Sequence, residues 1–241
     1  MRKIATLAIA LASLVPLASP SGAAGEGLVL HLKRHHRPGA PVIVVLQNAT
    51  DEPQHFETPW QITRAKTHEV VAQFHWSRND RRLAPDENAI WEWDQREGTQ
   101  SSDPAPPEQG DRVGPGGYIL TIGTGTDRIT KRFHIGRFFT LGFEGRPAAS
   151  FTVFVNEARP IRLMKAQAKA DDKTLIVSGK VRGARRYNDD WSYSMGPGSI
   201  VLGEVFIEVC DGSPGYVERH KEEWLGERWC PWSAYVDEIG R

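Results

Sequence analysis

The sequence predicts a mainly β protein in two parts, a β-sandwich followed by a small α+β domain that a disulfide holds together. The first part is predicted from short runs of β-branched and aromatic residues. These runs are separated by turn residues and show no helical period. The second part is predicted from strand-like and helix-like segments that alternate along the chain. The disulfide is predicted from the two cysteines, Cys210 and Cys230, which follow a secretory leader.

Residues 1–24 have the features of a secretory signal peptide. Arg2 and Lys3 precede an apolar run at residues 4–17, and residues 21–24 are small, as they are at a cleavage site. The apolar run is too short for a comfortable membrane span. We therefore expect a secreted or periplasmic protein without a membrane-spanning segment.

The charge of the mature chain argues against nucleic acid as a partner. The leader removes two of the 30 basic residues and none of the 30 acidic ones, which leaves a formal charge of about −2 with histidine neutral. A nearly neutral protein has little long-range attraction for phosphate backbones.

The first domain, residues 25–137, is predicted to be an immunoglobulin-like sandwich of about seven short strands. Residues 42–46 form a β-branched run that ends in a polar turn, and residues 70–76 are a second candidate strand. At residues 129–135 the apolar residues alternate, although a lysine interrupts the apolar face.

Three motifs of the first domain resemble a known family. Residues 83–87 read LAPDE, residues 91–95 read WEWDQ, and residues 113–118 read VGPGGY. In this order they resemble the L-x-P-G-E turn, the tryptophan-bearing strand and the P-G-x-Y turn of the bacillus intracellular proteinase inhibitor family. Asp86 stands where that family usually has glycine. The resemblance covers residues 27–137 and implies an all-β domain that could bind a protease.

The polar segment between Gln95 and Gly117 is unusually long for a loop inside a compact domain. Its Pro, Gly, Ser and charged residues favour a solvated insertion over a recognition loop. Residues 138–149 are predicted to be a connector. Its large apolar residues are expected to pack between the domains, because they would not be left in water: Phe138, Phe139, Leu141 and Phe143.

The second domain, residues 150–241, is predicted from the order strand, helix, strand, strand, helix. The expected strands are residues 150–156, 174–181 and 200–209, and the expected helices are residues 160–170 and 214–225. Pro160 is expected to open the first helix, with Ile161, Met164 and Ala168 on its apolar face. Ser213 is a possible N-cap of the second helix and Gly226 a possible stop, and its apolar face is expected to hold Tyr216, Val217, His220 and Trp224.

A Cys210–Cys230 bridge would join the end of the strand at 200–209 to the segment just after the last helix. In an oxidising compartment a structural bridge is favoured over free or metal-binding thiols. Two cysteines alone do not make a zinc site, and no Cys or His has the short ligand spacing of one.

Four segments of the second domain resemble a second family. They read YNDDWSYSM at 187–195, IEVCD at 207–211, YVE at 216–218 and WCPWS at 229–233. In this order they resemble a domain found at the N-terminus of a slime-mould calmodulin-binding protein and in many bacterial secreted proteins. The resemblance covers residues 150–238 and implies a secreted, disulfide-bearing binding domain. It does not transfer calmodulin as a partner, because a shared domain does not carry its partner with it.

No catalytic, cofactor or metal motif is recognisable in the sequence, and no cofactor is expected. Acid–base catalysis would need carboxylates or histidine in one cleft. The candidates lie in the second domain: Asp189, Asp190, Glu208, Asp211, His220, Glu222 and Glu223. The simpler interpretation of His220 is a half-buried packing residue. His35 and its neighbours are interpreted as a basic surface turn.

Aromatic residues are the candidate interaction residues, because aromatics with a polar group are favoured at binding surfaces: Tyr187, Trp191, Trp229 and Trp232. The alternative is that they surround the disulfide as core. The sequence therefore predicts a non-enzymatic binding protein with a protein partner, a peptidase being the first candidate. The alternatives are a carbohydrate or cell-envelope binding module that uses exposed tryptophans, and an uncharacterised hydrolase. The oligomeric state is not predicted.

Overall fold

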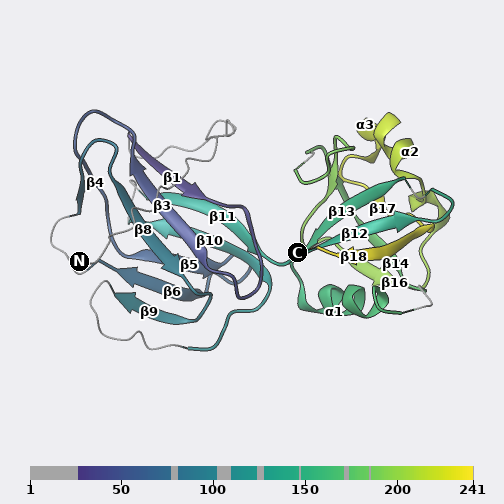
Figure 1. Cartoon of the computed structure of the whole chain (residues 1–241), viewed down its shortest axis with the longest axis horizontal. Coiled ribbons are helices and arrows are strands. Elements are labelled where there is room, and N and C mark those ends of the chain that lie inside the picture. Colours follow the sequence, from purple (N-terminus) through teal and green to yellow (C-terminus); the bar gives the residue numbers. More distant parts are fainter. Residues whose placement is uncertain are drawn as a thin grey trace, which may run out of the picture.

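The chain folds into two bodies that lie side by side (Figure 1). The structure, a computed structural model, describes residues 27–76, 81–101, 110–123, 128–146, 148–170, 174–184 and 186–240. The predicted signal peptide lies outside the described residues. The fold class is confirmed, with a β-sandwich in the first half and a smaller α+β body in the second.

The sandwich consists of two sheets that face each other across an apolar core. One sheet has the order β1 (Leu28–Leu32), β3 (Val42–Asn48), β8 (Asn88–Trp93). The other has the order β2 (His35–His36), β11 (Ile129–Ile135), β10 (Gly116–Ile122), β5 (Trp60–Arg64), β6 (Val70–His75), β9 (Gly98–Ser101). A small ribbon pairs β4 (Gln54–His55) with β7 (Arg82–Leu83).

Alternation along the strands decides which side chains form this core. In β3 the side chains of Val42, Val44 and Leu46 are fully buried, whereas Ile43 between them is half-exposed. Successive residues of a strand point to opposite faces of the sheet, so the β-branched run supplies one row to the core. Lys131, which interrupts the apolar face of β11, donates from its amine to the carbonyl oxygen of Leu30 at 2.8 Å.

Asp86 lies in the turn before β8 with a φ of 61°, in the left-handed region that glycine adopts freely. Aspartate is among the residues that tolerate this region, because its short polar side chain can bond locally. The backbone of this turn, and not a side-chain contact, therefore explains why glycine would also fit at this position.

The sequence predicts one solvated loop in the long polar segment after Gln95. The structure differs, because this segment contains β9. The Gln95 side chain is fully buried and receives a hydrogen bond from the amide of Gly39 at 2.7 Å. The Gln95 carbonyl accepts from the amide of Val113 at 2.8 Å, which ties the two ends of the segment together. Residues 102–109 of the segment lie outside the described residues.

The second body has two small sheets with α1 (Ala158–Gln167) below them and α2 (Pro214–Arg219) and α3 (Lys221–Trp224) at the opposite end (Figure 1). One sheet has the order β13 (Ser150–Val155), β12 (Arg137–Phe143), β18 (Ala234–Ile239). The other has the order β15 (Ser194–Met195), β14 (Ile176–Arg182), β16 (Val201–Gly203), and β17 (Arg228–Trp229) also pairs with β14. A short 3₁₀ helix spans Glu208–Cys210.

The predicted connector at residues 138–149 is wrong, because β12 occupies its first half. β12 is the central strand of its sheet and pairs with both β13 and β18. Three of its apolar residues, Phe139, Leu141 and Phe143, are buried in the core of the second body. The apolar character of this segment thus comes from a strand whose alternate residues face the core of the second body, and the chain passes from β11 to β12 through Gly136 alone.

Both predicted helices exist with different bounds. α1 begins at Ala158, two residues before Pro160, and buries Ile161 and Met164 as expected. The second predicted helix is broken at His220, whose φ of −113° and ψ of 26° leave the helical region. The break brings Trp224 against the core, where it is partly buried.

The ends of this second helical region follow the prediction, but its apolar face does not. Ser213 caps α2 by accepting from the amide of Tyr216, and Gly226 follows α3 with a φ of 87°. Of the four residues expected on one apolar face, Val217 alone is fully buried, because the two helices turn their remaining side chains in different directions.

The predicted strand at residues 200–209 is mostly wrong. β16 ends at Gly203, after three residues, and the chain then leaves the sheet. The chain must leave β16 because Cys210 is bonded to Cys230 beyond β17, at a Cα–Cα distance of 5.2 Å. The disulfide thus overrides the strand propensity of the valine-rich sequence.

The two bodies meet at a cluster of rings around His35. Its ring stacks on His134 at a centroid distance of 5.9 Å and lies 4.4 Å from Phe154 and 5.8 Å from Phe138 of the second body. The side-chain amide nitrogen of Asn156 lies 3.1 Å from Nδ1 of His134. Phe138 is therefore the member of the predicted connector that reaches the junction.

Burial keeps both junction histidines neutral. It lowers the pKa of His35 from 6.5 to about 3, with the nearby His134, Arg34 and Arg186 acting in the same direction. Burial, then Arg34 and Arg186, lowers the pKa of His134 from 6.5 to about 4. A proton on either ring would bring a further positive charge into this cluster.

The free energy of unfolding is therefore expected to fall as the pH is lowered below about 6.5. Below this pH the two histidines bind protons in the unfolded chain but stay neutral in the folded protein. Thermal unfolding followed between about pH 7 and pH 5, above the range in which most carboxylates titrate, measures this loss. His35→Phe is expected to reduce the pH dependence, because phenylalanine suits the aromatic surroundings and does not titrate. An equal pH dependence in this variant would contradict the role of His35.

Candidate functional site

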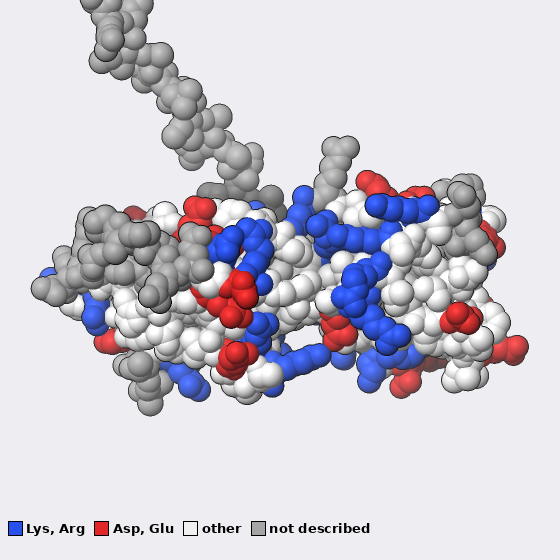
Figure 2. All heavy atoms as spheres, turned by 90° about the horizontal axis from the view of Figure 1, so that it is seen from below, with Lys and Arg blue, Asp and Glu red and all other residues white. Residues whose placement is uncertain are grey.

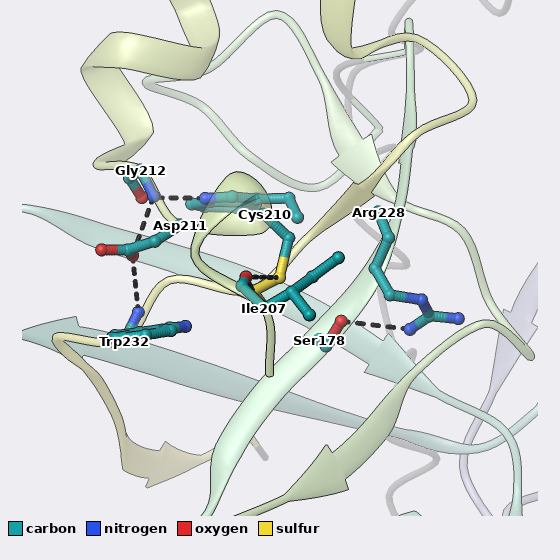
Figure 3. The surroundings of a disulfide bond; sticks show 9 residues. Ser178, Ile207, Cys210, Asp211, Gly212, Arg228 and Trp232 are labelled. Carbon is teal, nitrogen blue, oxygen red and sulfur yellow. Dashed lines mark hydrogen bonds between the residues drawn. A yellow bond between two sulfur atoms is a disulfide. The ribbon is translucent and has the colours of Figure 1, made fainter. Parts of the chain in front are cut away.

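The disulfide joins the segment after β16 to the segment after β17, and both cysteines are buried (Figure 3). The amide of Cys230 donates to the carbonyl of Cys210 at 2.7 Å. Asp211 binds the two segments a second time, because its Oδ1 accepts from the amides of Gly212 and Trp232, each at 2.8 Å. The covalent bond and these hydrogen bonds hold one rigid corner of the second body.

Trp229 fixes this corner to the core. Its side chain is fully buried and packs edge-on against Phe151 at a centroid distance of 4.9 Å and against Tyr193 at 5.6 Å. Its indole nitrogen donates to the carbonyl of Gly212 at 2.8 Å, which ties the disulfide loop to the core. Trp229 is thus core and is not on the surface, contrary to its prediction as an interaction residue.

The segment at residues 205–209 is exposed although it is apolar. The side chains of Val205, Ile207 and Val209 are 83%, 72% and 81% exposed. Large apolar residues are seldom exposed to this degree in succession, and such patches mark interaction surfaces. We name residues 205–209 together with Trp232 the apolar corner.

Trp232 is the candidate residue that lies at the surface of this corner. It is 41% exposed, and its backbone amide is held by Asp211 next to Cys210. This backbone contact holds Trp232 next to the end of the exposed segment, and its side chain is partly exposed to solvent.

Tyr187 lies at the junction of the two bodies and not at the apolar corner. Its ring packs against His35 and Phe138, and its hydroxyl donates to the carbonyl of Met195 at 3.1 Å. Burial raises the pKa of Tyr187 to about 12. Its role is therefore to join the bodies.

The neighbouring Asn188 is a structural residue that sequence reasoning left unassigned. Its buried side chain accepts from the amide of Thr152 at 2.7 Å and donates to the carbonyl of Thr152 at 3.0 Å. These two bonds imitate a strand partner at the edge of β13 and attach the loop before β15 to the sheet.

Replacement of Asn188 by alanine is expected to lower the free energy of unfolding of the second body by about 1–3 kcal/mol, because two part-buried backbone groups of Thr152 lose their partners. Chemical denaturation followed by tryptophan fluorescence measures this loss. Asp190→Ala, two residues on and exposed, serves as the control and is expected to change stability by less than about 0.5 kcal/mol. Equal effects of the two variants would contradict the structural role of Asn188.

Trp191 borders a separate shallow hollow of about 420 Å³, whose other lining residues are Arg146, Ala148, Ala149 and Asp190. The indole nitrogen of Trp191 donates to the carbonyl of Ser150 at 2.7 Å, so the ring is held in place. It is partly buried and packs against the core of the second body. The hollow therefore combines one fixed aromatic face with two charged side chains.

Of the acid–base candidates, His220, Glu222 and Glu223 border one hollow, whereas Glu208 and Asp211 do not line it. A hollow of about 320 Å³ at the turn between α2 and α3 is lined by residues 218–223, among them His220, but neither by Glu208 nor by Asp211. Nδ1 of His220 lies 3.6 Å from a carboxylate oxygen of Glu223. Asp211 is already occupied by backbone amides at the disulfide.

In the described part of the chain, no group of three or more His, Cys, Asp or Glu residues is placed to hold a metal ion. None of its helices is long and apolar enough to cross a membrane. The disulfide is compatible with an oxidising compartment outside the cytoplasm.

The second body also matches a known family. It contains the buried Trp229 and Cys230 and the disulfide. Residues 138–240 match the family model of the BP-74 N-terminal domain. The match supports the resemblance of the C-terminal region to a calmodulin-binding protein, and it begins at β12, before the expected start at residue 150. No curated protein matches the chain. The resemblance of residues 27–137 to the proteinase inhibitor family stays a prediction.

The exposed part of the apolar corner was missed by sequence reasoning, because the valine-rich sequence at 200–209 is typical of a buried strand. The available signal was the position of Cys210 at the end of that sequence. A cysteine that must reach Cys230 limits how far the preceding residues can follow the sheet.

Proposed function

We propose that this protein is a secreted, non-enzymatic binding protein that docks a protein partner at the apolar corner. The observation that carries the proposal is the exposure of Val205, Ile207 and Val209 in succession beside a disulfide. When a partner covers exposed apolar side chains, their burial favours binding by roughly 25 cal/mol per Å² of apolar area.

The disulfide supports this proposal because it holds the binding surface before the partner arrives. A flexible apolar loop would lose conformational entropy on binding, at about 0.5–1.5 kcal/mol for each immobilised side chain. The segment at 205–209 is anchored at Cys210 by the covalent bond and at Asp211 by hydrogen bonds. Trp232 adds an aromatic anchor, the residue type that is enriched at binding hot spots.

A peptidase is the first partner class to test, since the first domain resembles a proteinase inhibitor family. The experiment measures the activity of a panel of secreted and cytoplasmic proteases in the presence of micromolar mature protein. Inhibition that is lost in Val205→Ser/Ile207→Ser/Val209→Ser supports a peptidase partner at the apolar corner. If no protease in the panel is inhibited, the inhibitor form of the proposal is abandoned.

The second candidate function is carbohydrate binding in the hollow beside Trp191. A fixed aromatic face with neighbouring polar side chains is an arrangement on which a sugar ring can stack. Titration with glycans is expected to quench tryptophan fluorescence in the unaltered protein but not in Trp191→Phe. A flat response in the unaltered protein would reject this candidate.

A further inference from the structure

The backbone of the apolar corner is unpaired as well as exposed. β16 pairs with β14 as far as Gly203, and the chain then leaves the sheet. In the part of the chain that the structure describes, the amides of residues 205–209 donate to no backbone carbonyl. Because these residues lie at the surface, their amides are open to water or to the backbone of a partner.

Side chains alternate along the first part of this segment. Val205 and Ile207 are 83% and 72% exposed, whereas Phe206 between them is only partly exposed. The Phe206 ring turns back to the sheet, since a Cβ on Gly203 would lie 3.1 Å from its nearest ring carbon. Ile207 has an extended backbone, with a φ of −71° and a ψ of 145°. Residues 205–207 therefore form a short exposed edge with the period of a β-strand.

Two carboxylates accompany the apolar side chains of this edge. Glu204 precedes Val205, Glu208 follows Ile207, and both are exposed. Over the surface of the protein, opposite charges lie next to each other at several places, as Figure 2 shows for one face. Neither Glu204 nor Glu208 takes part in an ion pair of the described residues, which use other carboxylates: Glu69, Asp94, Glu97, Glu157 and Glu223. The apolar corner thus carries negative charge that no ion pair offsets.

This charge disfavours two possible occupants of the apolar corner. A second copy of the chain, paired about a two-fold axis, would set the same carboxylates against each other. An anionic membrane surface would repel them as well. A cationic polypeptide is the occupant that can cover the apolar side chains and also complement the charge.

We infer that the partner enters the apolar corner with an extended, basic segment in which lysine or arginine alternates with apolar residues. The inference rests on the proposed function and names the chemistry of its partner. In such strand addition, backbone hydrogen bonds to residues 205–207 supply affinity and alternate side chains supply specificity. With the period of two, apolar side chains of the partner would face Val205 and Ile207, and its cations would lie on the other face, toward the carboxylates.

The test measures the binding of synthetic peptides by isothermal titration at two salt concentrations. A Lys-Val repeat peptide is expected to bind the mature protein, more weakly at the higher salt, and a Glu-Val repeat peptide is expected not to bind. A Lys-Val peptide with N-methylated valines keeps the charge but loses backbone donors, so it is expected to bind about tenfold more weakly or worse. No binding of the Lys-Val peptide, or equal binding of the three peptides, would overturn the inference.

A matched pair of variants separates the apolar corner from net charge. Glu204→Gln/Glu208→Gln is expected to weaken binding of the Lys-Val peptide about tenfold. Asp51→Asn/Glu52→Gln removes two exposed carboxylates from the sandwich, so it changes the net charge equally, and it is expected to bind like the unaltered protein. Equal weakening by the two variants would overturn the inference, because net charge alone would then account for binding. Thermal unfolding of each variant establishes that it is folded.

Capture from the extracytoplasmic fraction of the host separates the failure of this inference from the failure of the proposed function. A partner is expected to be lost both by Glu204→Gln/Glu208→Gln and by Val205→Ser/Ile207→Ser/Val209→Ser. A partner that the acidic variant retains and the apolar variant loses would leave the proposed function standing and overturn the basic segment. A partner that both variants retain would overturn both. Binding to vesicles of phosphatidylcholine and phosphatidylglycerol, or self-association, that the apolar variant loses would assign the corner to a membrane or a second copy and overturn the inference.

Discussion

Reduction of the Cys210–Cys230 disulfide is expected to lower the free energy of unfolding of the second body by about 2–4 kcal/mol. The bond closes a loop across a sequence separation of 20 residues, for which the chain-entropy treatment gives about 3 kcal/mol. Calorimetry under oxidising and reducing conditions measures the effect, and the Cys210→Ala/Cys230→Ala variant reproduces it without added reductant.

The sandwich provides the internal control for this experiment, because its core contains neither cysteine. The transition of the second body is expected to move to lower temperature while that of the sandwich stays largely in place. A single cooperative transition that shifts as a whole would show instead that the ring cluster at His35 makes the two bodies one folding unit.

Replacement of Trp229 by alanine is expected to destabilise the second body by about 3–5 kcal/mol. The indole is fully buried among Phe151, Tyr193 and Phe143, and its removal leaves a cavity in the core. It also leaves the carbonyl of Gly212 without its donor. Chemical denaturation of the oxidised protein measures this effect separately from that of the disulfide.

Trp232 is the matched control, since it lies three residues further in the same WCPW sequence. Its side chain is 41% exposed, and its backbone amide makes the contact to Asp211. Trp232→Ala is therefore expected to cost less than about 1 kcal/mol, because the backbone contact survives the substitution. Equal losses for the two variants would contradict the assignment of Trp229 to the core and of Trp232 to the surface.

The sequence predicts those features of the fold that local patterns determine. The β-branched run of β3, the N-cap Ser213 and the stop at Gly226 follow from side-chain properties within a few residues. The sequence predicts a connector at β12 although its buried residues Phe139, Leu141 and Phe143 alternate along the strand, because the adjacent apolar Phe138 hides this period in the sequence.

The candidate site could be predicted only in part, because it depends on contacts between distant residues. The disulfide follows from compartment and cysteine number, but the departure of the chain at Gly203 depends on where Cys230 lies in space. Nothing in the sequence distinguishes Trp229 from Trp232. In the structure Trp229 is buried in the core and Trp232 is partly exposed.

The central claim is that the apolar corner binds a protein partner, and side-by-side capture from the extracytoplasmic fraction of the host tests it most directly. The unaltered mature protein is compared with Val205→Ser/Ile207→Ser/Val209→Ser and with a control, Ile43→Ser/Ile90→Ser, that removes exposed apolar side chains from the sandwich. Mass spectrometry identifies what each retains. We expect a protein that the unaltered chain and the sandwich control retain and the corner variant loses; a partner retained equally by all three would contradict the claim.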